Sequence, residues 1–495
     1  MPSIKKNGAS ATVNQEISSS LVTEILQETK IKSDTPKYSQ LKNNLGTLIS
    51  QMVETGREKE QISTTVIDAL IADIDEKLSN QVDAVLHHPE FQKLESAWRS
   101  LKFLVDQTDF NENIRLDIMN VSKEALIDDF SEADITKSGF YKTVYSAEYG
   151  QHGGRPFAAM IGNFEFGKET IDINLLKKIA SVATMSHAPF IAGTDPAMFS
   201  DSFENYAGLS KVDIKNFDSD ENEYAEWTAF RQSEDARYVG LTMPRFLLRT
   251  PYGEKTVRTK SFNYNEDVDN DHKNYLWGNA AFAFASRLTD SFAQYRWCAN
   301  IIGPDSGGAV EDLPLHKYEA MGNIQTKIPT ETLISDKQET DLSEAGFIPL
   351  VMRKGSNNAA FFSANSVQKA KSFGISEEGK QAEQNFKLGM QLPYMFIISR
   401  IAHYIKFIQR ENIGSWKTKD DLNRELNDWL RGYVSDQDNP SADTRSERPL
   451  REAHVDVKEV PGDVGWYEVG IQVKPHFKYM GAYFTLSLVG KLDKD

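Results

Sequence analysis

The chain has 495 residues, 40% of them hydrophobic, which is enough for about two to four domains with buried cores. Its 72 acidic and 56 basic side chains give a net charge of −16, which disfavours nucleic acid as a main partner because phosphate binding requires a basic surface. The single cysteine, Cys298, excludes an internal disulfide and indicates a reducing compartment, and we expect it to be a buried, inert thiol.

Residues 1–60 predict a flexible N-terminal region with one amphipathic helix at about 17–31. No apolar stretch of the secretory type follows Met1, so we expect a cytoplasmic protein. A short helix between polar flanks is not stable alone. It either docks on the rest of the chain or is a linear motif that folds when it binds a partner. Its apolar stripe contains Leu21, Val22, Ile25 and Leu26.

Residues 61–110 predict a helical region with an apolar face of helical period. Pro89 interrupts the pattern and restarts the helix. We expect His87 and His88, which precede it, to cap or to pack, because we find no further metal ligands nearby. The apolar face is larger than one pair of helices can cover, so we expect it to pack against a partner. It consists of Ile67, Leu70, Ile71, Ile74, Leu78, Phe91, Leu94 and Trp98.

Residues 111–434 predict a mixed α/β core. Apolar runs of strand length, such as 157–162 and 189–192, are interspersed with helical patterns at 171–185 and 278–301. The helical pattern at 278–301 is rich in alanine, which allows close packing.

Two more helices are expected before the C-terminal region. Residues 392–410 are the most apolar stretch, but Arg400, His403 and Lys406 make it too polar to span a bilayer, so we expect a helix packed in protein. The next helix, 418–433, has Thr418 at its N-cap and Asp421 three residues later.

Residues 435–495 predict a linker followed by strands. Residues 435–449 have the composition of a linker. Apolar and polar side chains then alternate at 453–458, 467–474 and 484–488, which is typical of half-buried strands. Because an unpaired edge recruits another chain, we expect an inter-subunit sheet. Its candidate residues are Tyr467, Val469, Ile471, Val473, Phe484, Leu486 and Leu488. The predicted class is therefore α+β: a mixed, multi-domain fold with N-terminal helices and C-terminal strands that join an inter-subunit sheet.

Motifs of enzyme chemistry are incomplete in this sequence. Residues 303–308 (GPDSGG) are similar to the loop around a chymotrypsin-type nucleophile, but Pro304 stands where a glycine is required. The acidic stretch from 267 has His272 and Gly278 where a calcium-binding EF-hand needs glycine and glutamate. No phosphate loop, zinc motif or nucleophile elbow is present. We therefore expect no catalytic residue, cofactor or metal, and an unrecognised active site near 303–314 stays an alternative.

Several blocks spread over residues 18–491 carry a resemblance to one family. They are LHHPEFQKLESAWRSL (86–101), WGNAAFA (277–283), YRWC (295–298), GFIPL (346–350), AAFF (359–362), LPY with SRIAHY (392–404) and MGAYFTLSLVGK (480–491). In this order they are similar to the large subunit of the type VI secretion contractile sheath, the TssC/VipB family.

This resemblance implies a structural protein and names its partners. The large subunit would pair with a small sheath subunit (TssB/VipA-like) through the helical region and polymerise with neighbouring copies around an inner tube of hexamers, on a baseplate. Contraction would propel that tube out of the cell. An unfoldase ATPase (ClpV-like) would then recognise the helix at 17–31 and dismantle the contracted sheath. A phage-tail-like sheath outside a secretion system stays an alternative.

Overall fold

The computed structural model divides the chain into two units, residues 1–78 and residues 79–495, and each is described by itself. The apolar stripe at 21–26, which was predicted to bind an ATPase, and the last predicted strand at 484–488 lie outside the described residues. The structure describes residues 64–132, 134–214, 217, 223–268, 271–320, 322–374, 376–435, 437, 440–460 and 467–476.

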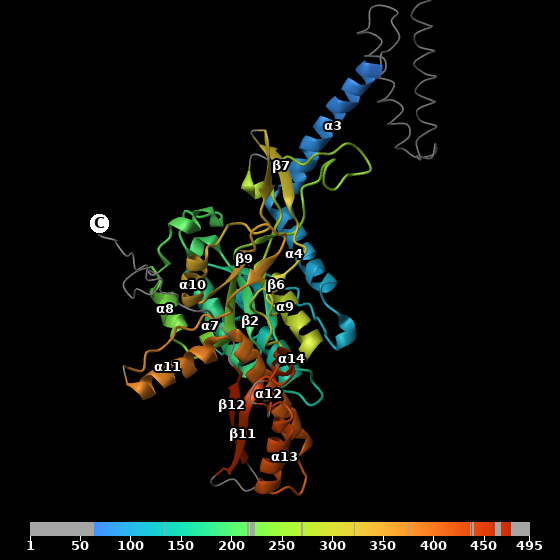
Figure 1. The fold of residues 1–495 in the computed structure, drawn as a ribbon. Helices are drawn as coiled ribbons and strands as arrows, with labels where there is room; N and C mark the ends of the chain where they lie inside the picture. Colours follow the sequence, from blue (N-terminus) through green and yellow to red (C-terminus); the bar gives the residue numbers. More distant parts are fainter. Residues whose placement is uncertain are drawn as a thin grey trace, which may run out of the picture. The chain divides into compact units, whose positions relative to one another are not determined.

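The helical region forms as predicted, with a break at Pro89. Helix α3 spans Thr64–Leu86, and α4 spans Pro89–Asp106 with proline in its first turn (Figure 1). Because proline lacks an N–H and has a fixed φ, it fits the first turn of a helix and not its interior.

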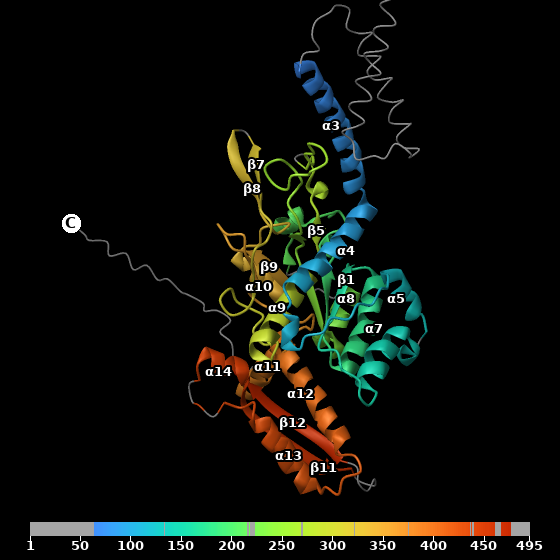
Figure 2. The ribbon, with the colours of Figure 1, turned by 90° about the vertical axis from the view of Figure 1, so that its right-hand side faces the viewer.

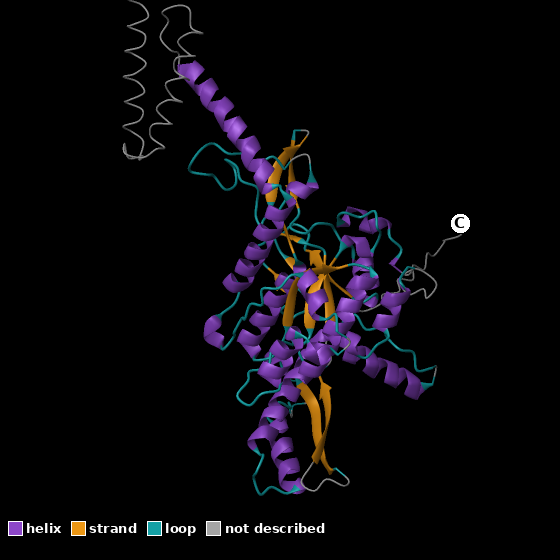
Figure 3. Cartoon of the chain, turned by 180° about the vertical axis from the view of Figure 1, so that it is seen from behind, coloured by secondary structure: helices purple, strands orange, loops and turns teal. Residues whose placement is uncertain are grey.

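A six-stranded sheet forms the centre of the second unit (Figure 3). The strands lie in the order β1-β2-β3-β9-β10-β6; β1, β2, β3 and β9 are parallel, whereas β10 pairs antiparallel with both β9 and β6. Their bounds are Met160–Phe166 (β1), Phe190–Thr194 (β2), Val239–Met243 (β3), Phe347–Met352 (β9), Ala359–Phe361 (β10) and Ala309–Val310 (β6). All residues of β2 and β3 are buried, which explains their continuous apolar sequence.

Each face of this sheet has its own hydrophobic core. Along β2, Phe190 and Ala192 enter one core and Ile191 the other, as the alternation of a strand requires. The first core includes Trp227, whose ring stacks on Phe347 with centroids 5.9 Å apart. Its helices are α7 (Thr170–Ser186), α8 (Ala225–Arg231) and α10 (Asp336–Glu344).

The second core is built on α9, which spans Ala280–Tyr295. The predicted helix at 278–301 was too long at its C-terminal end, because Arg296 adopts a left-handed conformation (φ 65°) and ends the helix. The small residues of α9 let α4 approach closely, and Leu104 of α4 packs against Phe282 and Ala285.

Helix α12 (Leu392–Glu411) joins the main cores to a third one. Met395 belongs to the first core and Phe396 to the second, while Ile401 and Ile405 belong to the third. The close approach of its first turn to the sheet depends on Gly240 of β3, where a Cβ would lie 2.9 Å from the Leu392 side chain.

The third core lies between α12, α13 (Lys419–Arg431) and a two-stranded sheet of β11 (Leu450–Glu459) and β12 (Tyr467–Pro475) (Figure 2). The capping box of Thr418 and Asp421 forms as predicted. Residues 435–449 were predicted as a linker and contain a short helix, α14 (Ala442–Glu447), which Ser441 caps. Serine- and aspartate-rich sequence is common to linkers and helix caps, so composition did not separate them.

The remaining elements are short or lie at the surface. No described helix is long and apolar enough to cross a membrane. The other helices are α5 (Lys123–Asp129), α6 (Gly139–Tyr141), a π-helix at Lys142–Tyr149 and α11 (Glu377–Met390), and the other strands are β4 (Phe246–Leu247), β5 (Trp277–Gly278), β7 (His316–Ala320) and β8 (Asn323–Lys327).

Candidate assembly surfaces

The apolar stripe predicted on the helical region lies at the surface. On α4, Leu94 is 56% and Trp98 66% exposed, and Phe91 is also exposed. On the described part of the first unit, Ile71, Ile74 and Leu78 are exposed on α3. Ile67 and Leu70 lie on the same helix. Exposed apolar side chains that repeat along a helix are typical of an interaction surface.

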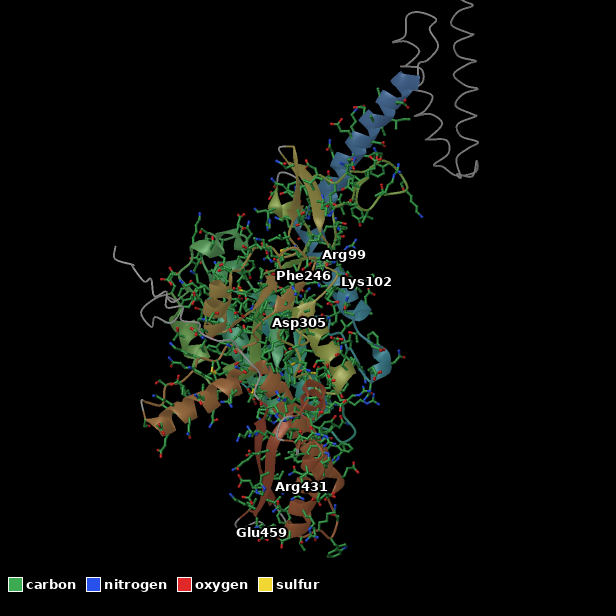
Figure 4. The ribbon with its side chains drawn as sticks, in the orientation of Figure 1. Arg99, Lys102, Phe246, Asp305, Arg431 and Glu459 are labelled. Carbon is green, nitrogen blue, oxygen red and sulfur yellow. The ribbon has the colours of Figure 1, made fainter. Side chains whose placement is uncertain are left out.

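The opposite face of α4 is fixed to the body of the second unit. The Phe103 and Phe246 rings lie 5.3 Å apart, and the Ser96 hydroxyl donates to the Trp277 carbonyl oxygen over 2.7 Å. Figure 4 shows Arg99 and Lys102 on this helix, with Phe246 close by. The exposed stripe is therefore presented by a helix whose position is already set.

A buried ion-pair network holds the start of α4 and the end of α3. The Arg249 guanidinium donates to both carboxylate oxygens of Glu266, over 2.6 and 3.0 Å, and to Glu95 of α4 over 3.0 Å. The Glu266 side chain is fully buried. Removing one member of such a network typically costs about 3–5 kcal/mol, because the other charge stays buried without its partner.

Two residues of α3 and its turn join this network. The Tyr264 hydroxyl donates to Asp83, and burial together with this hydrogen bond raises the pKa of Tyr264. The His87 ring nitrogen Nε2 lies 3.3 Å from Glu266. We find no cluster of potential metal ligands among the residues that the structure describes. His87 thus contacts a carboxylate, a role that its position before Pro89 did not reveal.

The predicted C-terminal strands pair with each other within the chain. The antiparallel ladder runs from Glu459 opposite Tyr467 to Leu450 opposite Pro475. Tyr467, Val469 and Val473 pack against the third core, whereas Ile471 is 36% exposed. Figure 4 marks the end of this ladder at Glu459.

The outer edge of β11 is occupied by other parts of the chain. The Asn427 side chain of α13 accepts from the Val455 N–H over 3.0 Å and donates to the Val455 carbonyl oxygen over 2.8 Å. At the start of the strand, the Leu450 backbone bonds to Tyr433 and Ser435. A new strand therefore meets two filled positions on this edge, Leu450 and Val455.

The outer edge of β12 has no strand partner among the described residues. The backbone N–H and carbonyl oxygen of Val455 both bond to Asn427, so neither is available to Ile471, the residue opposite on β12. Val455 and Ile471 are therefore a non-hydrogen-bonded pair of the ladder. The backbone groups of Ile471 then point away from β11, to the open edge. Alternate residues share this direction, so the same holds for Tyr467, Val469 and Val473.

The loop 303–308 shows no sign of a catalytic triad in the described chain. It is a tight turn with Gly303 at φ 85° and Gly307 at φ 96°, and it borders a cavity of about 1390 Å³. Ser306 and His476 both line this cavity, but no hydrogen bond joins them in the described part of the chain. Cys298, expected to be buried, is half-buried; its Sγ donates to the Leu288 carbonyl oxygen over 3.6 Å, and burial raises the pKa of the thiol to about 12.

Comparisons with known proteins find two matching family models and a full-length relative. The EvpB/VC_A0108 tail sheath N-terminal domain matches residues 68–368, and the EvpB/VC_A0108 tail sheath gpW/gp25-like domain matches residues 381–492. The chain is 36% identical to the type VI secretion system sheath protein TssC1 of Pseudomonas aeruginosa, over 98% of each chain.

One solved structure aligns weakly. The cryo-EM structure of the anti-feeding prophage baseplate covers 65% of this chain and 66% of that chain, with 7% identity and a TM-score of 0.35, which is too low to support an argument. The two family models and the full-length relative confirm the resemblance found in the sequence: the chain belongs to the EvpB/VC_A0108 tail sheath family, the large sheath subunits of type VI secretion systems.

Proposed function

We propose that this protein works in the cytoplasm as a non-enzymatic large subunit of a contractile sheath. It pairs with a small sheath subunit, polymerises around an inner tube on a baseplate, and contracts to drive that tube out of the cell. Membership of the tail sheath family is the observation that carries this proposal. An enzyme is disfavoured because the family is structural and the described residues offer no catalytic constellation.

We assign pairing to the exposed apolar side chains of α4 and, in the first unit, to those of α3. Burial of apolar surface contributes roughly 25 cal/mol per Å², so covering side chains as large as Trp98 and Leu94 contributes several kcal/mol in total. The network around Arg249 and Glu266 holds the helix before the partner arrives. A preset helix loses little conformational entropy on binding, which favours a stable heterodimer.

The polymer contact is a strand added to the open edge of β12. Main-chain hydrogen bonds would supply the affinity, with no need for nucleotide hydrolysis. They would form with Tyr467, Val469, Ile471 and Val473. The filled edge of β11 directs the incoming strand to β12. We assign the donated strand to the segment 484–488 of a neighbouring copy or to the small subunit.

The ATPase contact is the predicted helix at 17–31. Replacing Leu21 and Ile25 with aspartate is expected to leave assembly intact and to stop the disassembly of contracted sheath. Unchanged binding of the ATPase would overturn this assignment.

Electron microscopy of the chain expressed with its neighbouring small-subunit gene tests the whole proposal. Ribbed, hollow tubes are expected. Discrete soluble particles of constant size, with both proteins well expressed, would contradict a sheath.

A further inference from the structure

Helix α12 belongs to the gpW/gp25-like domain and packs against the N-terminal sheath domain. The family models divide the chain between residues 368 and 381, yet the first turns of α12 lie in the two main cores. One face of this helix meets α7 and the π-helix, both parts of the N-terminal domain. His403, Lys406 and Arg410 lie on this face, spaced three and four residues apart.

His403 is the centre of the contact between α12 and the N-terminal domain. It is 5% exposed, and its Nε2 donates to the Ser186 carbonyl oxygen at the end of α7 over 2.9 Å. Its Nδ1 is buried without a hydrogen-bond partner in the described chain. The ring lies 5.5 Å from Tyr149 and 6.4 Å from His187. His403 is therefore held as the neutral form, with its one proton on Nε2.

The groups around His403 are aromatic or cationic. The Lys406 ammonium lies 3.3 Å from the centre of the Tyr149 ring, and Arg410 donates to the Tyr149 carbonyl oxygen over 2.6 Å. On α12 itself, Arg400 is one turn away and stacks on Tyr404.

From the N-terminal domain, His187 ends α7 and its Nδ1 lies 3.0 Å from the Tyr238 hydroxyl. The charged groups near Tyr238 are Arg237 and Asp235, which affect its pKa in opposite directions. Tyr145 of the π-helix lies under Lys406 on the other side, at 5.3 Å. Asp235 raises the pKa of Tyr238. Among the described residues, Arg400, His187 and Lys406 are the neighbouring groups whose charge lowers the pKa of His403.

A proton on His403 would destabilise this contact for two reasons. The new Nδ1–H would be buried without an acceptor. The new charge would also lie near the cations Arg400 and Lys406 and near His187. Burial, followed by these neighbours, lowers the pKa of His403 to about 4, and burial together with Lys406 lowers the pKa of His187.

We propose that this cluster is an acid-sensitive latch between the two sheath domains. Protonation of His403 and His187 releases the middle of α12 from the end of α7 and from the π-helix, and the gpW/gp25-like domain then moves more freely. Both histidines are neutral in the docked state and accept protons when the contact opens. The contribution of the two histidines to docking is therefore complete above the ordinary histidine pKa of 6.5, and that of His403 is lost as the pH falls toward about 4. Lys406, whose pKa burial lowers to about 8, makes a separate contribution at alkaline pH.

Hydrogen exchange of the full-length chain tests the latch, whether or not the chain forms a sheath. Amides in 396–410 and 180–188 are compared at about pH 7.5 and about pH 5, after correction for intrinsic exchange rates. Protonation of His403 alone is expected to lower their protection roughly thirtyfold, because the pKa of His403 is about 4 when the contact is docked and 6.5 when it is open. Amides of β3 should keep their protection. Loss of protection in β3 at the same pH would mean global unfolding and would overturn the latch.

His403→Gln keeps a donor for the Ser186 carbonyl oxygen and does not titrate, so the pH effect should disappear. His454→Gln is the matched control, because His454 is exposed on β11 of the same domain; it should behave as the wild type. Lys406→Met removes a neighbouring charge and should move the opening to lower pH. A wild-type pH response in both His403→Gln and Lys406→Met would refute the proposal.

Discussion

Two sheets of the second unit, the six-stranded sheet and the β11–β12 sheet, differ in how their faces and edges are covered. The six-stranded sheet is covered on both faces, and its inner strands β2 and β3 are buried throughout. The β11–β12 sheet has one face on α12 and α13, one filled edge and one open edge. A two-stranded sheet is marginal alone. The first sheet therefore defines a domain, whereas the second is suited to completion by another chain.

The largest effect should come from the covered sheet. Trp227→Ala removes a fully buried ring that stacks on Phe347, so the free energy of unfolding should fall by about 3–5 kcal/mol. Chemical denaturation followed by tryptophan-independent circular dichroism measures this change. A fall of under about 1 kcal/mol would mean that this core is not the main source of stability.

The exposed stripe on α4 tests whether an open apolar surface predicts a partner. Trp98→Asp should leave the fold intact and weaken pairing with the small subunit by about 2–4 kcal/mol, the size of an interface hot spot. Co-purification and titration of the two subunits measure this loss. Lys93→Asp, which also introduces an aspartate at an exposed position of the same helix and changes the charge by even more, should pair normally. Equal pairing by both variants would exclude this face from the interface.

The open edge of β12 can be blocked without breaking its own ladder. Ile471→Pro removes an outward N–H, so it should abolish long sheaths, at a cost of about 0.5–1.5 kcal/mol per lost hydrogen bond in each inter-subunit contact. Electron microscopy of the assembled protein measures tube length. Gln472→Pro is the control; it removes an inward N–H of the β11–β12 pair and should lower stability instead. Normal tubes from Ile471→Pro would refute strand addition here.

The Asn427 contact tests whether a side chain protects the outer edge of β11. Asn427→Ala leaves the Val455 N–H and carbonyl oxygen without their side-chain partners, so stability should fall by about 1–2 kcal/mol. The same variant should associate without order, because a second edge becomes available. Light scattering at increasing concentration measures this association. A variant as monodisperse as the wild type would show that Asn427 has no protective role.

Local patterns predicted much of the fold because their causes lie close together in the sequence. The Thr418–Asp421 cap, helix α12 and the strands β11 and β12 follow from spacing within a few residues. Arg249 bonds to Glu95, which is 154 residues away, and Asn427 bonds to Val455 across 28. Periodicity carries no information about such pairs. The stripe at Leu94 and Trp98 was predicted, while the network that holds its helix was not.

The length of α12 has a mechanical consequence. Its 20 residues extend over about 30 Å at 1.5 Å per residue. Its first turn packs against the sheet at Gly240, and its C-terminal half packs in the third core. A rotation of α12 by about 10° about its first turn would displace its C-terminal end by roughly 5 Å, a distance comparable to the spacing between neighbouring strands. A small change in the packing beside Leu392 would thereby move the open edge of β12, to which a neighbouring subunit would bind, by about the distance between two strands.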